Sequence, residues 1–245
     1  MTASLVRPSP PQTRQNRMTL ASVVRGKIAE RPYRLLVHGT DGVGKSSFGA
    51  AAPGAVFIGP EDGTGHLDVA RFPAPADFGD AIDAVSTLTL EKHEHKTLVV
   101  DSLDWLEPIV WDHVCRAANQ PDIEAFGYGK GYAAALDQWR VLLAALERMQ
   151  KATAMHVVMI AHSFIKPFRN PEGEDFERYV LKLNEKAAAL CREWSEGVFF
   201  ANYETFAVKD KAKRVRGVSS GALLLHTQRT AAYDAKDRYN LPPTL

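Results

Sequence analysis

The sequence predicts an α/β fold: a mostly parallel sheet flanked by helices, with antiparallel strands at the C-terminal end. Short apolar runs alternate with longer stretches in which apolar residues recur every three or four positions, as strands and helices alternate in such a fold. A phosphate-binding motif joins the first predicted strand to the first helix. With 245 residues, of which 45% are hydrophobic, the chain is long enough to bury one such core.

The N-terminal part has a different composition from the rest. Residues 1–18 hold three prolines and many polar residues, so we assign them to a disordered basic arm and residues 19–245 to a single domain. A short helix over 19–28 is expected to lead into the first strand. The ends of the chain are basic around an acidic centre, a distribution that suits contact with a nucleic-acid backbone or solvated tails equally well.

The phosphate-binding motif is complete and lies in the context that it requires. Residues 33–38 are predicted as a strand and residues 47–52 as the first turns of a helix, and between them stands Gly39-Thr40-Asp41-Gly42-Val43-Gly44-Lys45-Ser46. The glycines let backbone N–H groups turn inward around phosphate oxygens at the positive end of a helix. Lys45 is expected to bridge the outer phosphates and the Ser46 hydroxyl to ligate Mg²⁺. The sequence therefore predicts a nucleoside triphosphate site with Mg²⁺.

Two further apolar strands end in acids. Residues 55–59 run into Glu61, and residues 97–101 end in Asp101. Parallel strands deliver such carboxylates to the edge of the sheet where the phosphate loop lies, so Asp101 is expected to hold the Mg²⁺ shell. Asp101 is followed by a serine and not by a second acid. Glu61 is therefore the candidate for orienting the attacking water, with Asp62 as the fallback and a loop-capping role as the alternative for Glu61.

Three helices and a further buried strand are predicted in the middle of the domain. The helices cover residues 75–90, 103–118 and 132–151, and Trp105 in the second of them is expected to pack in the core. The strand over 155–161 ends at His162. A polar residue at this strand tip is expected to sense the γ-phosphate through a hydrogen bond, with an ordinary strand-end histidine as the alternative.

Two predicted loops combine cations with aromatic residues. They cover residues 121–131 and 164–177, and the second is expected to be mobile. Charge neutralisation by Lys or Arg and base stacking on Phe or Tyr are the ingredients of sequence-tolerant single-strand binding, although aromatic residues in loops also pack against the protein. The candidate DNA contacts are Phe126, Tyr128, Lys130, Lys166, Phe168 and Arg169.

The C-terminal part is predicted to be mainly β-structure. A strand over 179–183 and a helix over 185–194 precede strands over 198–203, 222–227 and 231–235, with a basic turn at 209–216. The last strand stops at Lys236-Asp237-Arg238. Side chains one residue apart on an extended segment point the same way, so Lys236 and Arg238 are expected to reach a neighbouring subunit's phosphate site, with exposed ion pairing as the alternative.

Cysteine usage and hydropathy exclude several classes of protein. Cys115 and Cys191 lie far apart without metal-ligand spacing, so neither a disulfide framework nor a zinc site is expected. The sequence has no apolar run near 18 residues, so we expect a soluble cytoplasmic protein that does not enter a membrane.

The order of these pieces resembles the RecA-type ATPase core. It resembles more closely the phage-encoded RecA-like nucleotide-binding proteins, which act in single-strand annealing and recombination. The resemblance spans roughly residues 33–243 and rests on the segments at 42–46, 100–103, 127–132, 160–163 and 235–242.

The resemblance implies roles for matching positions. It implies that residues Gly39 to Ser47 bind ATP, that Asp101 acts on Mg²⁺ and that Glu61 is the catalytic glutamate. The two loops fall where RecA proteins bind DNA, and the Lys-x-Arg pair at 236–238 matches one that related proteins insert across a subunit interface. His162 replaces the glutamine of RecA, and no N-terminal domain of RecA size is expected.

The resemblance further implies a partner set and an activity. The partners are single-stranded DNA, further copies of the chain in a ring or filament, and a single-strand-binding protein as an additional candidate, in the cytoplasm of the host cell. The activity is a DNA-stimulated ATPase that supports annealing or recombination. The alternatives are an annealing or mediator module that ATP organises without turnover, and a translocating helicase. A small-molecule kinase is disfavoured because no arginine-rich lid follows the strand of Asp101.

Overall fold

The computed structural model describes residues 20, 23, 31–61, 63–209 and 215–245. The predicted basic arm, nearly all of the helix expected over 19–28, Asp62 and the centre of the basic turn lie outside this part of the chain. The protein divides into two units, Met1–Arg31 and Pro32–Leu245. The second unit contains the whole of the fold described below.

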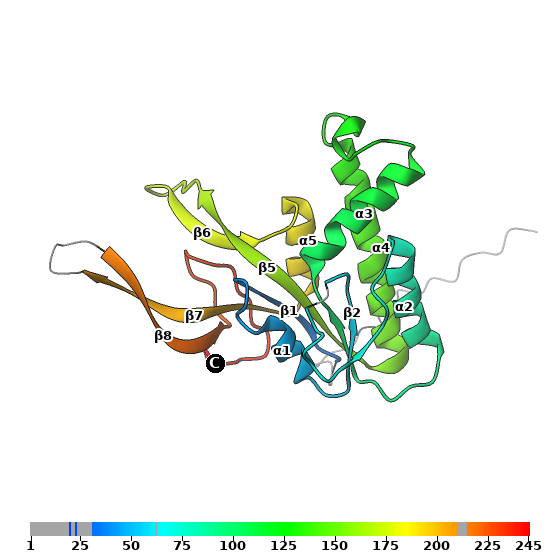
Figure 1. Ribbon diagram of the computed structural model, residues 1–245, viewed down its shortest axis with the longest axis horizontal. Helices are drawn as coiled ribbons and strands as arrows, with labels where there is room; N and C mark the ends of the chain where they lie inside the picture. Colours follow the sequence, from blue (N-terminus) through cyan, green and yellow to red (C-terminus); the bar gives the residue numbers. More distant parts are fainter. Residues whose placement is uncertain (1–19, 21–22, 24–30, 62, 210–214) are drawn as a thin grey trace, which may run out of the picture. The chain divides into compact units, whose positions relative to one another are not determined.

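An eight-stranded sheet forms the centre of the second unit (Figure 1). Its strand order is β3-β2-β4-β5-β1-β7-β8, and β6 pairs with β5 outside this path. The pairs from β3 to β7 are parallel, whereas β6 and β8 run antiparallel to their partners. The strands are β1 (Arg34–Gly39), β2 (Ala55–Ile58), β3 (Ala70–Arg71), β4 (Thr97–Val100), β5 (His156–Phe168), β6 (Phe176–Leu181), β7 (Gly197–Lys209) and β8 (Val215–His226).

Helices cover both faces of this sheet. They are α1 (Lys45–Ala50), α2 (Phe78–Leu90), α3 (Leu103–Ala117), α4 (Lys130–Thr153) and α5 (Glu185–Trp194), with a short 3₁₀ helix at Glu124–Phe126. The predicted fold class, a mostly parallel sheet flanked by helices with antiparallel strands at the C-terminal end, is confirmed. None of the described helices has the length and apolar character needed to cross a membrane.

The core is split into two layers by the sheet. Along β5, Val157 and Met159 pack in one layer with α2, α3, α4 and α5, while Val158 and Ile160 pack in the other with residues of α1. This alternation is what a strand buried on both faces requires, and it explains the unbroken apolar runs in the sequence. Because β5 lies between β1 and β4, the strands that lead into the phosphate loop and to Asp101 are not neighbours.

Trp105 was expected in the core, and this prediction is wrong: its side chain is 52% exposed. The buried stripe of α3 runs instead through Leu103, Leu106, Val110 and Val114, at helical spacings of three and four. Trp105 precedes Leu106 by one position, which places it about 100° away around the helix and toward solvent.

The loop predicted over 164–177 is a β-hairpin. β5 continues through Phe168, pairs with β6 from Phe176 onward, and leaves only residues 169–175 as the connection. The turn signal at 170–173 was interpreted correctly, but the aromatic and β-branched residues on both sides of it favour strands. β6 therefore begins three residues before the predicted strand.

Two C-terminal predictions also need correction. β7 and β8 form a hairpin much longer than the predicted strands at 198–203 and 222–227 (Figure 1). The sequence of its outer half carries many polar residues, so it lacks the alternation that marks a half-buried strand. The strand predicted over 231–235 is absent from the described residues: Tyr233 bridges β6 and Lys236 bridges β7, and two single bridges to different strands make no ladder.

Candidate nucleotide-binding site

The phosphate loop connects β1 to α1 in the predicted geometry. Gly42 and Gly44 have φ values of 70° and 82°, in the left-handed region that favours glycine. The Lys45 ammonium donates hydrogen bonds to the backbone oxygens of Thr40 at 2.8 Å and Gly39 at 3.4 Å, so it faces the inside of the loop. Burial lowers the pKa of Lys45, and nearby carboxylates oppose this shift. The loop therefore presents a cation where the outer phosphates of a nucleotide would lie.

Asp101 follows β4 and lies beside the loop. Its side chain is buried, and Oδ2 makes no hydrogen bond with the described residues. Burial raises the pKa of Asp101, while a hydrogen bond from the Ser46 side chain opposes this effect. A buried carboxylate oxygen without a partner, next to a serine hydroxyl, is an oxygen donor set that fits Mg²⁺, and bound Mg²⁺ would neutralise charge on the phosphates.

Glycine is required at position 59 because β2 and β4 meet closely there. A Cβ atom at Gly59 would lie 1.6 Å from the backbone oxygen of Asp101. The Asp101 N–H also donates to the Ile58 backbone oxygen at 2.9 Å. These contacts fix the backbone of Asp101 against the strand that leads to Glu61.

Glu61 and Asp101 face a common cavity of about 280 Å³. The Ser102 hydroxyl donates a hydrogen bond to Glu61 Oε2 at 3.0 Å, which orients this carboxylate. Arg71 and Phe72 line the same cavity. The structure thus brings together the two acids that the sequence assigned to water activation and Mg²⁺ binding.

His162 lies within β5 and is held by Asp104. The backbone N–H of His162 donates to Asp104 Oδ1, and the ring Nδ1–H donates to Asp104 Oδ2, both at 2.9 Å. This hydrogen bond to Asp104 raises the pKa of His162 against the effect of burial. Burial alone would raise the pKa of Asp104, but the hydrogen bonds from His162 outweigh it and lower that pKa. Nε2 points toward the phosphate loop, 3.7 Å from Asp41 Oδ1.

Asp104 is a site residue that sequence reasoning missed. It lies in the first turn of α3, three residues after Asp101, and its side chain is only 2% exposed. An acid in the first turn of a helix is an ordinary helix-stabilising feature, so the spacing alone carries no signal. Its role depends on β5 running beside the start of α3.

His38 was also missed, and it links the phosphate loop to the C-terminal segment. The buried ring contacts Ser163 Oγ through Nδ1 at 2.8 Å and the Asp234 backbone oxygen through Nε2 at 2.9 Å. Because a carbonyl oxygen only accepts, Nε2 donates and Nδ1 accepts from Ser163. Burial lowers the pKa of His38 to about 4, so the ring is neutral near pH 7.

The candidate DNA contacts lie on two separate elements, the α3–α4 connection and the β5–β6 hairpin (Figure 1). In the first, Tyr128 is fully exposed and Lys130 begins α4, whereas Phe126 packs partly against the core.

In the hairpin, Lys166 pairs with Glu185, and Arg169 is exposed. The Phe168 ring lies 5.2 Å from the Arg178 guanidinium. The aromatic candidates therefore differ in exposure: Tyr128 is free of packing, whereas Phe168 is held by an arginine.

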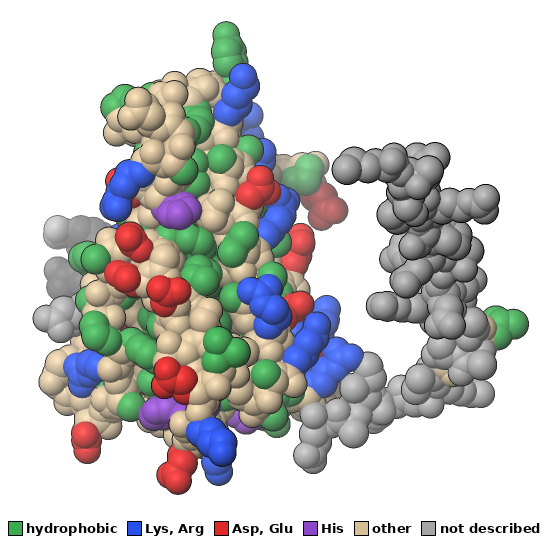
Figure 2. Space-filling model, turned by 90° about the vertical axis from the view of Figure 1, so that its right-hand side faces the viewer, with side chains coloured by type: hydrophobic (Ala, Val, Ile, Leu, Met, Phe, Trp, Pro, Cys, Tyr) green, Lys and Arg blue, Asp and Glu red, His purple; other side chains and the backbone are tan. Residues whose placement is uncertain are grey.

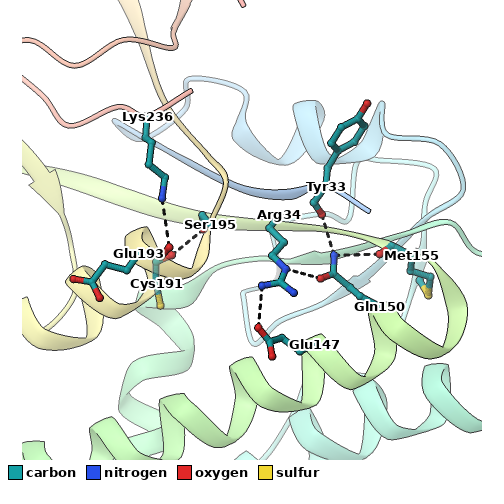
Figure 3. Close-up of polar contacts among 9 residues, drawn as sticks. All are labelled: Tyr33, Arg34, Glu147, Gln150, Met155, Cys191, Glu193, Ser195 and Lys236. Atoms are coloured by element: carbon teal, nitrogen blue, oxygen red, sulfur yellow. Dashed lines mark hydrogen bonds and ion pairs between the residues drawn. The ribbon is translucent and has the colours of Figure 1, made fainter. Parts of the chain in front are cut away.

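The Lys-x-Arg pair lies against α5 of the same chain. The Lys236 ammonium donates to the backbone oxygen of Arg192 at 2.7 Å, at the C-terminal end of α5. It also donates to the backbone oxygen of Glu193 at 3.4 Å (Figure 3). A lysine at this helix end satisfies free carbonyl groups and complements the helix dipole. Arg238 is exposed and makes no ion pair with the described residues. A contact of either residue with another subunit remains a prediction.

Comparison with known families agrees with this geometry. A family model described as an AAA domain matches residues 31–239, which is most of the chain and includes the loop, Glu61, Asp101 and His162. No curated protein matches the chain. The chain therefore belongs to the AAA domain family and has the α/β core of a P-loop nucleotide-binding ATPase.

Proposed function

We propose that this protein is an ATPase that binds single-stranded DNA and supports strand annealing or recombination, hydrolysing ATP between subunits of a homo-oligomer. The AAA domain supports nucleotide binding and hydrolysis in general. The arrangement of side chains around the phosphate loop supports a particular mechanism, and the β5–β6 hairpin supports a connection to DNA.

The proposed hydrolysis uses residues from three strand ends. Glu61, oriented by Ser102, positions water for in-line attack on the γ-phosphate. Lys45 binds the outer phosphates, and Ser46 with Asp101 would hold Mg²⁺. His162 Nε2 would stabilise the negative charge that develops on the γ-phosphate. Arg238 and Lys236 of a neighbouring subunit would stabilise the same charge.

One observation carries the proposed coupling to DNA. β5 is a single continuous strand from His156 to Phe168, with His162 in its middle. The residues after His162 form one arm of the hairpin that carries Lys166 and Phe168. A paired strand transmits displacement along its length, so a hydrogen bond between His162 and the γ-phosphate would shift the hairpin residues with it. Nucleotide state and DNA affinity would then depend on one another.

The test is ATP turnover with and without single-stranded DNA. We expect turnover that rises on addition of DNA, and a Lys45→Ala variant that hydrolyses no ATP. Turnover no higher than in the Lys45→Ala variant, in both conditions, would contradict the enzymatic proposal.

A Glu61→Gln variant separates hydrolysis from nucleotide-driven assembly. We expect it to bind ATP but to lose turnover, and to lose DNA annealing with it. Annealing that survives Glu61→Gln but not Lys45→Ala would show that nucleotide binding suffices and that the non-hydrolysing alternative holds.

A further inference from the structure

Three cavities adjoin one another along α5 and the C-terminal segment. The first, of about 440 Å³, lies against the β5–β6 hairpin and shares Arg178, Arg192 and Asp234 with the second, of about 450 Å³. The second shares Arg229 and Lys236 with the third, of about 420 Å³. Because neighbouring cavities share lining residues, they lie side by side in a row, which we call the basic trough.

Cations outnumber acids along the basic trough. The acids that line it are Glu185, Glu193, Asp234 and Asp237. Its cations are Lys166 and Arg169 at the hairpin end, Arg178 and Arg192 at the first junction, Arg229 and Lys236 at the second, and Arg238 at the far end. The side on which α2 and α4 lie is different, because acidic and basic side chains are interspersed there (Figure 2). An excess of one charge in a depression attracts a ligand of the opposite charge.

Asp234 fixes the arginines of the basic trough. Arg178 pairs with Asp234 Oδ1 at 2.6 Å, Arg192 pairs with Oδ2, and Arg229 approaches Oδ1 to 3.7 Å. One carboxylate compensates one of three guanidinium groups and holds them in place, so two positive charges remain for a ligand.

Arg178 retains an unused donor. Its side chain is only 8% exposed, and its buried Nε makes no hydrogen bond with the described residues. A phosphate oxygen arriving from solvent cannot reach this buried N–H, so Arg178 serves the trough by holding Asp234 in place. Arg178 lines the junction of the first two cavities, where it anchors the carboxylate that Arg192 and Arg229 share.

The hairpin end of the basic trough adds aromatic surface. Phe164, which is 43% exposed, and Phe168 line the first cavity together with Lys166 and Arg169. Aromatic faces beside a row of cations suit unstacked bases joined by phosphates, whereas a duplex keeps its bases stacked on one another.

We propose that the basic trough is a path for single-stranded DNA, in which Arg192 and Arg229 bind backbone phosphates, Arg178 holds Asp234 between them, and Phe164 and Phe168 stack with bases. The choice of single-stranded DNA rests on the proposed function. The path itself extends DNA contact well beyond the hairpin, onto α5 and the C-terminal segment. It is separate from the α3–α4 connection that carries Tyr128.

The test measures binding of the full chain to a fluorescent oligothymidylate by anisotropy at several salt concentrations. The trough variant combines Arg192→Gln with Arg229→Gln. The matched control combines Arg140→Gln with Arg148→Gln, two exposed arginines of α4 outside the three cavities. We expect the trough variant to bind at least about tenfold more weakly, with a slope of log K against log salt shallower by roughly 1.4, since each phosphate contact to a single strand contributes about 0.7. The control should match the native chain.

Arg229→Gln alone carries the test if the double variant does not fold, because this side chain is 68% exposed. It should make the salt slope shallower by about 0.7, and Arg229→Lys should restore it. Polyglutamate serves as a second probe. It tests whether an acidic peptide, rather than single-stranded DNA, occupies the basic trough.

The outcomes distinguish the two proposals. If the native chain binds no oligothymidylate, the proposed function and the trough fail together. If the native chain binds and the trough variant binds equally well, the trough is overturned while the proposed function stands. Loss of polyglutamate binding without loss of oligothymidylate binding would also overturn it, in favour of an acidic peptide.

Discussion

The phosphate loop gathers acids around one lysine, whereas the basic trough gathers arginines around one aspartate. Lys45 lies among Asp41, Glu61, Asp101 and Asp104, so negative charge dominates the nucleotide site. In the trough, Arg178, Arg192 and Arg229 surround Asp234, so positive charge dominates there. Both sites suit phosphate ligands, but they do so by opposite arrangements of charge.

The difference in charge predicts which of the two sites requires a metal ion to bind its ligand. A triphosphate is repelled by a cluster of carboxylates unless a divalent cation accompanies it. A polyanion in the basic trough meets guanidinium groups directly and releases the ions that it carried. We therefore expect Mg²⁺ to control the first site and monovalent salt to control the second.

Removal of Mg²⁺ should have the largest effect and should separate the two sites. With EDTA in place of Mg²⁺, we expect binding of a fluorescent ATP analogue to be lost, while oligothymidylate binding measured without nucleotide is retained. Raising the salt concentration should weaken oligothymidylate binding far more than it weakens Mg²⁺-dependent nucleotide binding. If EDTA weakened the binding of both ligands equally, the two sites would not differ in their requirement for Mg²⁺.

Asp101→Asn should abolish most of the catalytic rate. The substitution removes the carboxylate charge beside Ser46, and losses of about 100-fold or more in kcat are usual when a group that stabilises the transition state is lost. Asp137→Asn on the exposed face of α4 is the matched control and should leave kcat unchanged. Steady-state phosphate release measures both, and a kcat for Asp101→Asn within a few-fold of native would exclude a role for Asp101 in catalysis.

Asp234→Asn should destabilise the fold moderately. It leaves three arginines together without their carboxylate, and Arg178 is almost fully buried, so we expect a loss of roughly 1–3 kcal/mol in the free energy of unfolding. Asp137, whose pair with Arg140 is exposed, gives the comparison: Asp137→Asn should cost less than about 1 kcal/mol. Urea unfolding measures both, and equal losses would mean that Asp234 does not organise the trough.

Asp104→Asn should have the smallest effect, a shift in the titration of His162. Asp104 raises the pKa of His162, so the variant should titrate at lower pH, as followed by NMR of the imidazole protons. The raised pKa stabilises the native chain fully below the ordinary histidine pKa of about 6.5, and this contribution is lost as pH rises through the raised value. An unchanged titration would show that the hydrogen bonds from His162 to Asp104 do not set its charge.

The nucleotide site could be predicted from the sequence because its parts are local. The phosphate loop is a contiguous motif, and Asp101 and Glu61 each follow a short buried strand whose direction the fold class already fixes. Asp104 and His38 could not be predicted in the same way. Each acts through a residue that another strand or segment brings beside it, and neither residue type is unusual at its position.

The trough was not predictable because no segment contains it. Arg178 comes from β6, Arg192 from α5 and Arg229 from the segment after β8, and only the packed fold places them around Asp234. The hairpin was mistaken for a loop for a related reason, since strand pairing between 163–168 and 176–181 is a non-local property. The length of β7 and β8 was not predicted because the sequence of their outer half lacks the alternation of apolar and polar residues that marks a half-buried strand.

The most direct measurement is an experimental structure of the chain with Mg²⁺, a non-hydrolysable ATP analogue and an oligothymidylate. We expect the analogue's phosphates against Lys45 and Ser46, and the DNA phosphates against Arg192 and Arg229. DNA that contacts only the α3–α4 connection around Tyr128, with the arginines around Asp234 untouched, would contradict the account of two oppositely charged phosphate sites.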